Sequence, residues 1–202
     1  MRVLLTGLSE ERIQNKMVFP SLPGVPAELQ SIETITKGRK LMNQAYTLPE
    51  LTREFKNEAY TVLHLATHGI FGGRAEDTFL LTYDGRMTMN RLESLIQTGM
   101  FRENNVDLLT LSACQTAQGN EQAAFGLAGI AVKAGVKSAI ATLWSVDDAA
   151  TSRLLSEYYR QYAAGGVSKA KALQIAQKKL IEQPRFWHPS FWSPFLLIGN
   201  WH

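Results

Sequence analysis

This chain of 202 residues contains a single cysteine, Cys114. One cysteine excludes an intrachain disulfide and a cysteine-rich zinc site. This usage is typical of proteins in a reducing compartment, so we expect a cytoplasmic protein.

The chain also lacks a strong excess of charge and any long apolar run. It has 21 Lys and Arg residues against 18 Asp and Glu, a formal net charge of +3. The basic residues are scattered, so we expect no direct contact with nucleic acid. Lys133 and Lys137 interrupt the longest apolar candidate, which leaves no run of about 18 residues for a membrane span. The apolar start is too short for a signal peptide.

What the sequence does contain is an alternation of apolar runs and segments with helical periodicity. Strands are predicted at 2–8, 40–44, 60–66, 105–113, 137–146 and 193–199, and a hairpin at 78–88. Helices are predicted at 23–36, 47–57, 90–98, 121–135, 148–164 and 168–182. The strongest strands are near-continuous apolar runs, typical of parallel strands buried on both faces. We therefore predict one α/β domain over residues 1–202, with helices on both faces of a mostly parallel central sheet.

Two of the predicted strands end in reactive residues. His68 follows the strand in "VLHLATHGIF", and Cys114 follows the strand in "LLTLSACQT". Ligands of open parallel sheets bind at the carboxyl ends of the strands. If the two strands are neighbours, an imidazole that takes the thiol proton would make Cys114 a nucleophile. The N–H groups of Gly69 and Cys114 are the candidate donors to a developing oxyanion.

Other interpretations of these residues compete with this one. A lone cysteine is often a small core residue. His64 and His68 could be considered as metal ligands, but four strand residues span about 13 Å, so one ion cannot reach both. His64 is interpreted as a core or supporting histidine, and no metal or cofactor is expected. "TGLSEE" lacks the glycines of a dinucleotide-binding turn, which disfavours a nucleotide-binding α/β domain.

Four blocks in this order resemble a CHAT domain, a caspase-like module often attached to TPR repeats in bacteria. They are "VLHLATHGIF", "LLTLSACQTAQG", "GLAGIAVKAGVKSAIATLWSVDDAAT" and "HPSFWSPFLLIGNW". The resemblance implies a three-layer caspase-like fold and a cysteine endopeptidase with His68 as general base and Cys114 as nucleophile. These two residues are 46 positions apart, close to the roughly 50 of caspases, although "SACQT" replaces the caspase signature.

The same resemblance bears on partners and on chain organisation. It implies a peptide or protein substrate, and regulation by a partner protein or by attached TPR repeats. Family members commonly carry another stretch before the first strand, so we expect this chain to be an excised part of a longer one. The alternative function is a catalytically silent caspase-like module that holds a peptide in the same cleft.

"LWSVDDAAT" at 143–151 resembles a segment of separase, a distant relative that cleaves after arginine. By that resemblance Asp148 is the acidic residue that binds a basic substrate side chain, with Asp147 as the second candidate. A carboxylate can hold an arginine through two hydrogen bonds. The structural alternative is a capping box formed by Ser145 and Asp148 at the start of a helix.

Overall fold

The computed structural model describes residues 1–70, 78–100, 105–112, 129, 134–144 and 146–202. The strands are β1 (Val3–Gly7), β2 (Arg12–Gln14), β3 (Met17–Phe19), β4 (Arg39–Met42), β5 (Val62–Ala66), β6 (Gly69–Ile70), β7 (Phe79–Thr82), β8 (Gly85–Thr88), β9 (Leu108–Ser112), β10 (Ser138–Thr142) and β11 (Phe195–Gly199). The helices are α1 (Val25–Thr36), α2 (Leu48–Asn57), α3 (Met89–Met100), α5 (Asp148–Ala164) and α6 (Lys169–Ile181), with short 3₁₀ turns at Asn43–Ala45 and Pro189–Phe191.

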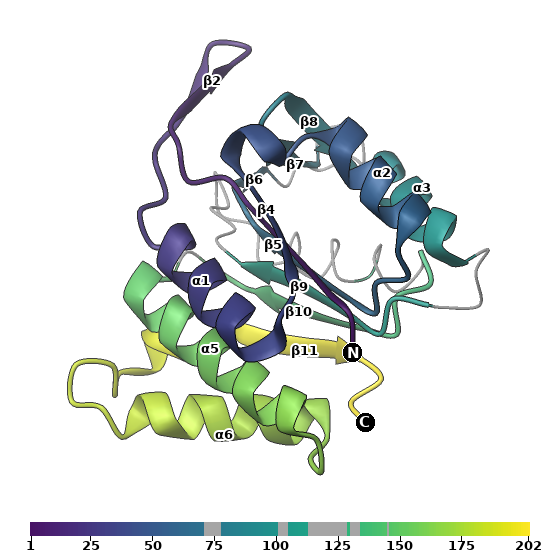
Figure 1. Cartoon of the computed structure of the whole chain (residues 1–202). Coiled ribbons are helices and arrows are strands. Elements are labelled where there is room, and N and C mark those ends of the chain that lie inside the picture. The colour runs from purple at the N-terminus through teal and green to yellow at the C-terminus, as the bar shows by residue number, and fades with distance from the viewer. Residues whose placement is uncertain (71–77, 101–104, 113–128, 130–133, 145) are drawn as a thin grey trace.

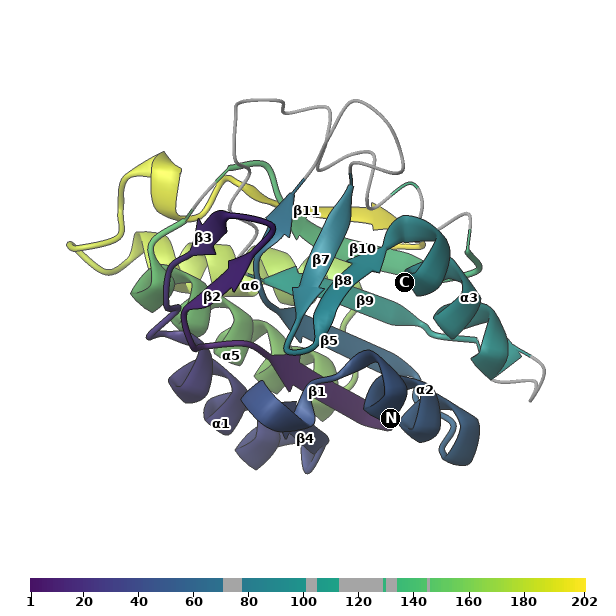
Figure 2. The same ribbon diagram turned by 90° about the horizontal axis from the view of Figure 1, so that it is seen from above.

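A six-stranded sheet in the order β11-β10-β9-β5-β1-β4 forms the centre of the molecule. All neighbouring pairs are parallel except β10 and β11, which are antiparallel. Figures 1 and 2 show α1, α5 and α6 on one face of this sheet and α2 and α3 on the other. The predicted mostly parallel sheet with helices on both faces is confirmed.

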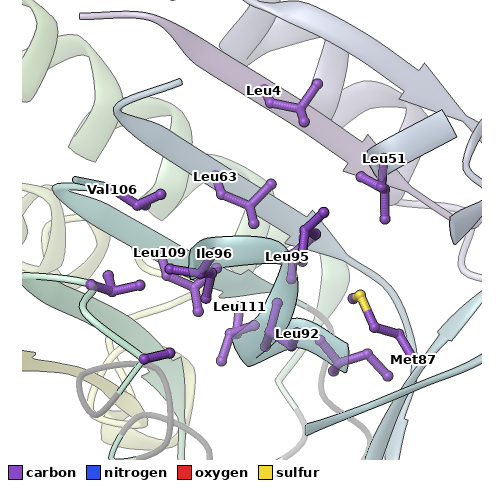
Figure 3. Close-up of a cluster of buried hydrophobic side chains, with 14 of the residues drawn as sticks. Leu4, Leu51, Leu63, Met87, Leu92, Leu95, Ile96, Val106, Leu109 and Leu111 are labelled. Carbon is purple, nitrogen blue, oxygen red and sulfur yellow. The ribbon is translucent and has the colours of Figure 1, made fainter. Parts of the chain in front are cut away.

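The alternation of side chains along the central strands builds one core on each face. Leu63 and Leu65 of β5 belong to the cluster under α2 and α3, whereas Val62 and Ala66 belong to the cluster under α1 and α5. Figure 3 shows side chains of β1, β5 and β9 meeting those of α2 and α3 in the first cluster. Each fully buried leucine contributes about 1.5–3 kcal/mol by leaving water. Burial on both faces explains why these strands are near-continuous apolar runs.

Side-chain caps fix where three helices begin. The hydroxyl of Thr47 accepts from Glu50 N at the start of α2, and Ser168 accepts from Lys171 N at the start of α6, as predicted. Ser145, the capping residue of the alternative interpretation, lies outside the described residues. The N-cap of α5 is Asp147, whose Oδ1 accepts from Ala150 N at 2.9 Å.

The sequence prediction missed the hairpin formed by β2 and β3, which projects from the rest of the molecule (Figure 1). Its turn residues Asn15 and Lys16 both have positive φ, at 50° and 65°. Two such residues are typical of a type I′ turn, and the asparagine was the signal that could have revealed it. Ile13 and Val18 pair across the hairpin and are 71% and 61% exposed.

The predicted 78–88 hairpin is present as β7 and β8, and β6 adds a third strand to it. The predicted helix at 121–135 lies mostly outside the described residues. In the described part of the chain, no helix combines the length and the apolar content that a membrane crossing needs.

Candidate functional site

The strand that leads to His68 and the strand that leads to Cys114 are direct neighbours. β5 and β9 pair in parallel with His64 opposite Thr110 and Ala66 opposite Ser112. Beyond the last pair, the N–H of Thr67 still donates to the carbonyl oxygen of Ser112 at 3.2 Å. The ends of β5 and β9 therefore lie side by side at the carboxyl edge of the sheet.

Cys114 itself lies outside the described residues, two positions after Ser112. The described part of the candidate site is centred on His68.

One contact defines the tautomer of His68. Its Nε2 lies 2.7 Å from the carbonyl oxygen of Pro20, in the segment that follows β3. A carbonyl oxygen only accepts, so Nε2 carries the proton and donates it. In the neutral ring the lone pair is then on Nδ1, which makes Nδ1 the basic nitrogen. The Phe19 ring packs on the same imidazole, with centroids 5.6 Å apart.

The sequence carried no signal for the role of Pro20. Every residue has a carbonyl group, so nothing in the residue type marks this position as an orienting group. Only the path of the chain after the unpredicted hairpin brings it to His68.

The surroundings of His68 favour its neutral form. The side chain is 2% exposed, and burial lowers its pKa below the ordinary value of 6.5. The hydrogen bond to Pro20 and the negative charge of Asp148 offset part of that lowering of the pKa. A buried histidine with a depressed pKa and a fixed tautomer is suited to accept a proton near neutral pH.

Gly69, the predicted oxyanion donor, begins β6 directly after His68. The N–H of Leu81 in β7 donates to the carbonyl oxygen of His68 at 2.8 Å, while Gly69 stands opposite Leu80. This makes Gly69 and Leu80 a pair that does not exchange hydrogen bonds. The ladder with β7 therefore does not use the Gly69 N–H.

Asp148 and Asp147 stand side by side at the start of α5 but have different surroundings. Asp147 is exposed and caps its own helix. Asp148 is half-buried, and its Oδ2 accepts from the N–H of Gly24 at 3.1 Å. The negative charge of Asp148 raises the pKa of His68.

His64 is fully buried and belongs to the core, as predicted. Its Nδ1 lies 3.2 Å from the Tyr159 hydroxyl, which in turn donates to Thr110 Oγ1 at 2.9 Å. Its Nε2 lies 2.9 Å from Oε1 of the buried Glu28, at ion-pair distance but outside hydrogen-bond geometry. This network joins α1, β5, α5 and β9 from the inside. Within the described residues, no three side chains of the metal-ligating types gather at one point.

Comparisons with known proteins agree with this architecture. The CHAT domain family matches residues 2–200. A solved structure, that of protein GSU0716 from Geobacter sulfurreducens, superposes with a TM-score of 0.55 at 12% identity. The superposition covers 98% of this chain and 93% of that one, and at this identity it supports the fold alone. No curated protein matches the sequence. Since the family match spans nearly the whole chain, the chain belongs to the CHAT domain family of caspase-like modules.

Proposed function

We propose that this domain is a cysteine endopeptidase in which His68 and Cys114 form the catalytic dyad. The observation that carries the proposal is the state of His68. It is a buried imidazole at the carboxyl edge of the sheet, held by Pro20 as the tautomer with a basic Nδ1. The neighbouring strand β9 ends two residues before the only cysteine of the chain.

In the proposed reaction, Nδ1 of His68 takes the proton from the Cys114 thiol. The thiolate attacks the carbonyl carbon of the scissile bond and forms a tetrahedral intermediate, whose oxyanion accepts hydrogen bonds from the N–H groups of Gly69 and Cys114. Each such donor is worth about 3–4 kcal/mol. The imidazolium then gives its proton to the leaving amine, and water hydrolyses the thioester with His68 again acting as base.

We propose a basic residue before the scissile bond, with Asp148 as its partner. Asp148 is half-buried, and its charge acts on the pKa of His68, which supports this proposal. A guanidinium can form two charge-assisted hydrogen bonds to a carboxylate. Asp147, which is exposed and engaged in capping α5, is the weaker candidate.

The test is a panel of fluorogenic peptides with Arg, Lys, Asp or Leu before the reporter group. We expect cleavage of the Arg and Lys peptides, and no cleavage by Cys114→Ala or His68→Ala. Asp148→Ala should lose the preference for basic peptides. Cleavage that survives Cys114→Ala rejects the dyad, and preferred cleavage of the Asp peptide rejects the specificity.

A further inference from the structure

A short connector contacts two groups of the proposed site, the His68 imidazole and the Asp148 carboxylate. It runs from Pro20 to Gly24, between β3 and α1. At its start the Pro20 carbonyl oxygen accepts from His68 Nε2 at 2.7 Å. At its end the Gly24 N–H donates to Asp148 Oδ2 at 3.1 Å. Asp148 is 124 positions away in sequence, so the contact ties the start of α5 to the start of α1.

The connector is anchored between these two contacts. Leu22 is buried, and its N–H donates to the carbonyl oxygen of Ser9 at 2.9 Å. Its own carbonyl oxygen accepts from Val25 N at 3.2 Å. Phe19 before the connector and Val25 after it are also buried. Packing at both ends and in the middle holds the spacing between Pro20 and Gly24.

The backbone does not explain why residue 24 is a glycine. Its φ of −76° and ψ of −25° lie in the right-handed helical region, which any residue adopts. The contact with Asp148 does explain it. A Cβ at position 24 would lie 2.6 Å from Asp148 Cβ and 3.0 Å from both Cγ and Oδ2. No side-chain rotation moves Asp148 Cβ, so the start of α1 or of α5 would have to shift, and the Asp148 carboxylate would be displaced from the Gly24 N–H.

We propose that Gly24 is a positioning residue for substrate specificity, which holds the Asp148 carboxylate in the orientation that receives a basic side chain. The inference rests on the proposed function. The N–H of Gly24 is neutral, so it orients the carboxylate without cancelling its charge. No ion pair between described residues includes Asp148. Through the connector, the same segment that orients His68 also orients Asp148.

Binding of uncleavable peptides tests this proposal independently of catalysis. Two peptides differ only before the reduced scissile bond, where one has arginine and the other has citrulline, its neutral isostere. Calorimetry gives the ratio of their dissociation constants for the wild type, Gly24→Ala, Asp148→Asn and Gly38→Ala. Gly38→Ala is the matched control, because its Cβ would meet Val3 and Thr36 at 3.0–3.1 Å, beyond the opposite end of α1.

We expect the wild type to prefer arginine by about tenfold or more, as the loss of one good charge-assisted contact implies. Gly24→Ala and Asp148→Asn should both lose most of that preference, and Gly38→Ala should keep it. In the double variant Gly24→Ala/Asp148→Asn, the preference should fall no further than in Asp148→Asn alone, because both changes act on one contact. Circular dichroism of each variant verifies folding. If Gly24→Ala does not fold, Asp148→Glu replaces it. This change keeps the negative charge but moves the carboxylate away from the Gly24 N–H, so it should lose most of the preference for arginine, and an unchanged preference would overturn the positioning role.

The outcomes separate this inference from the proposed function. An arginine preference that depends on Gly24, in a protein that cleaves no peptide, supports the positioning role and rejects the peptidase. If the wild type cleaves after arginine and Gly24→Ala binds the arginine peptide over the citrulline peptide as strongly as the wild type does, the positioning role is rejected and the peptidase proposal stands. A wild type that binds both peptides equally overturns the inference, and the Gly24–Asp148 contact then only joins α1 to α5.

Discussion

The carbonyl oxygen of Pro20 accepts a hydrogen bond from Nε2 of His68 at 2.7 Å, across 48 positions of sequence. The acceptor is a backbone atom, so the contact depends on where the chain passes and not on which side chain it carries. It fixes the proton on Nε2 and leaves Nδ1 as the basic nitrogen of the proposed dyad.

Asp148 should control the basicity of His68. Burial lowers the pKa of His68, and the negative charge of Asp148 raises it part of the way back because it stabilises the imidazolium. Asp148→Asn removes that charge, so the pKa of His68 should fall further below 6.5. NMR titration of the His68 ring measures this directly, and the acid limb of kcat/KM should move to lower pH in parallel.

Asp147→Asn is the control for this titration. The asparagine keeps an oxygen that can accept from Ala150 N, so the helix cap is preserved. The charge that raises the pKa of His68 is that of Asp148, which this variant retains. Its His68 titration should match that of the wild type. A His68 midpoint at or above 6.5 in the wild-type protein would contradict the burial of the ring.

Phe19 should support both the hairpin and the imidazole. It is buried against His68 and Phe79, with ring centroids 5.6 and 6.5 Å away. Phe19→Ala should lower the free energy of unfolding by about 3–5 kcal/mol, as is typical of phenylalanine truncation in a core. Peptide cleavage should fall as well, because the Pro20 carbonyl that follows Phe19 loses its support. Urea denaturation and the peptide panel measure the two effects.

Val18→Ala is the matched control, one residue earlier on the opposite face of β3. Val18 is 61% exposed, so its truncation should change stability by no more than about 0.5 kcal/mol. Equal losses in the two variants would mean that the hairpin acts as a whole and that Phe19 has no special part in it.

The buried contact between Glu28 and His64 should stabilise the packing of α1 on the sheet. His64 Nε2 lies 2.9 Å from Glu28 Oε1, and His64 also contacts Tyr159 in the same buried network. Glu28→Ala leaves His64 without this polar neighbour and should cost about 1–3 kcal/mol of stability. Glu28→Gln should cost less, because it keeps a polar group of the same size beside His64.

Glu33→Ala, on the same helix α1, is the control for Glu28→Ala. Glu33 pairs with Lys40 at the surface, where an ion pair is worth about 0–1 kcal/mol. Glu33→Ala should therefore be nearly neutral in thermal unfolding. If Glu28→Ala is equally neutral, the internal network does not stabilise the contact between α1 and the sheet.

The features of the fold that follow from local pattern were predictable from the sequence. The apolar runs of β5 and β9 predicted parallel strands, and the two strands are neighbours in the sheet. In sequence, His68 and Cys114 each follow one of them by two residues. Thr47 and Ser168 marked the beginnings of their helices, because a hydroxyl cap is a local interaction. Asp148 was named from a resemblance, and its role in specificity stays a prediction.

What the sequence did not reveal depends on contacts between distant segments. The β2–β3 hairpin was missed because its residues alternate weakly and the outward pair Ile13 and Val18 is apolar. The contact between Gly24 and Asp148 involves a glycine whose φ is ordinary, so no local signal marked it.

The most direct test of the central claim is covalent trapping of the nucleophile. The protein is incubated with a peptide that carries arginine followed by a thiol-reactive electrophile, and intact-mass spectrometry with peptide mapping locates the adduct. The dyad predicts one equivalent of adduct on Cys114 in the wild type, none in Cys114→Ala, and labelling slowed by at least about a hundredfold in His68→Ala. A wild type that stays unlabelled, or a His68→Ala variant labelled at the wild-type rate, would contradict it.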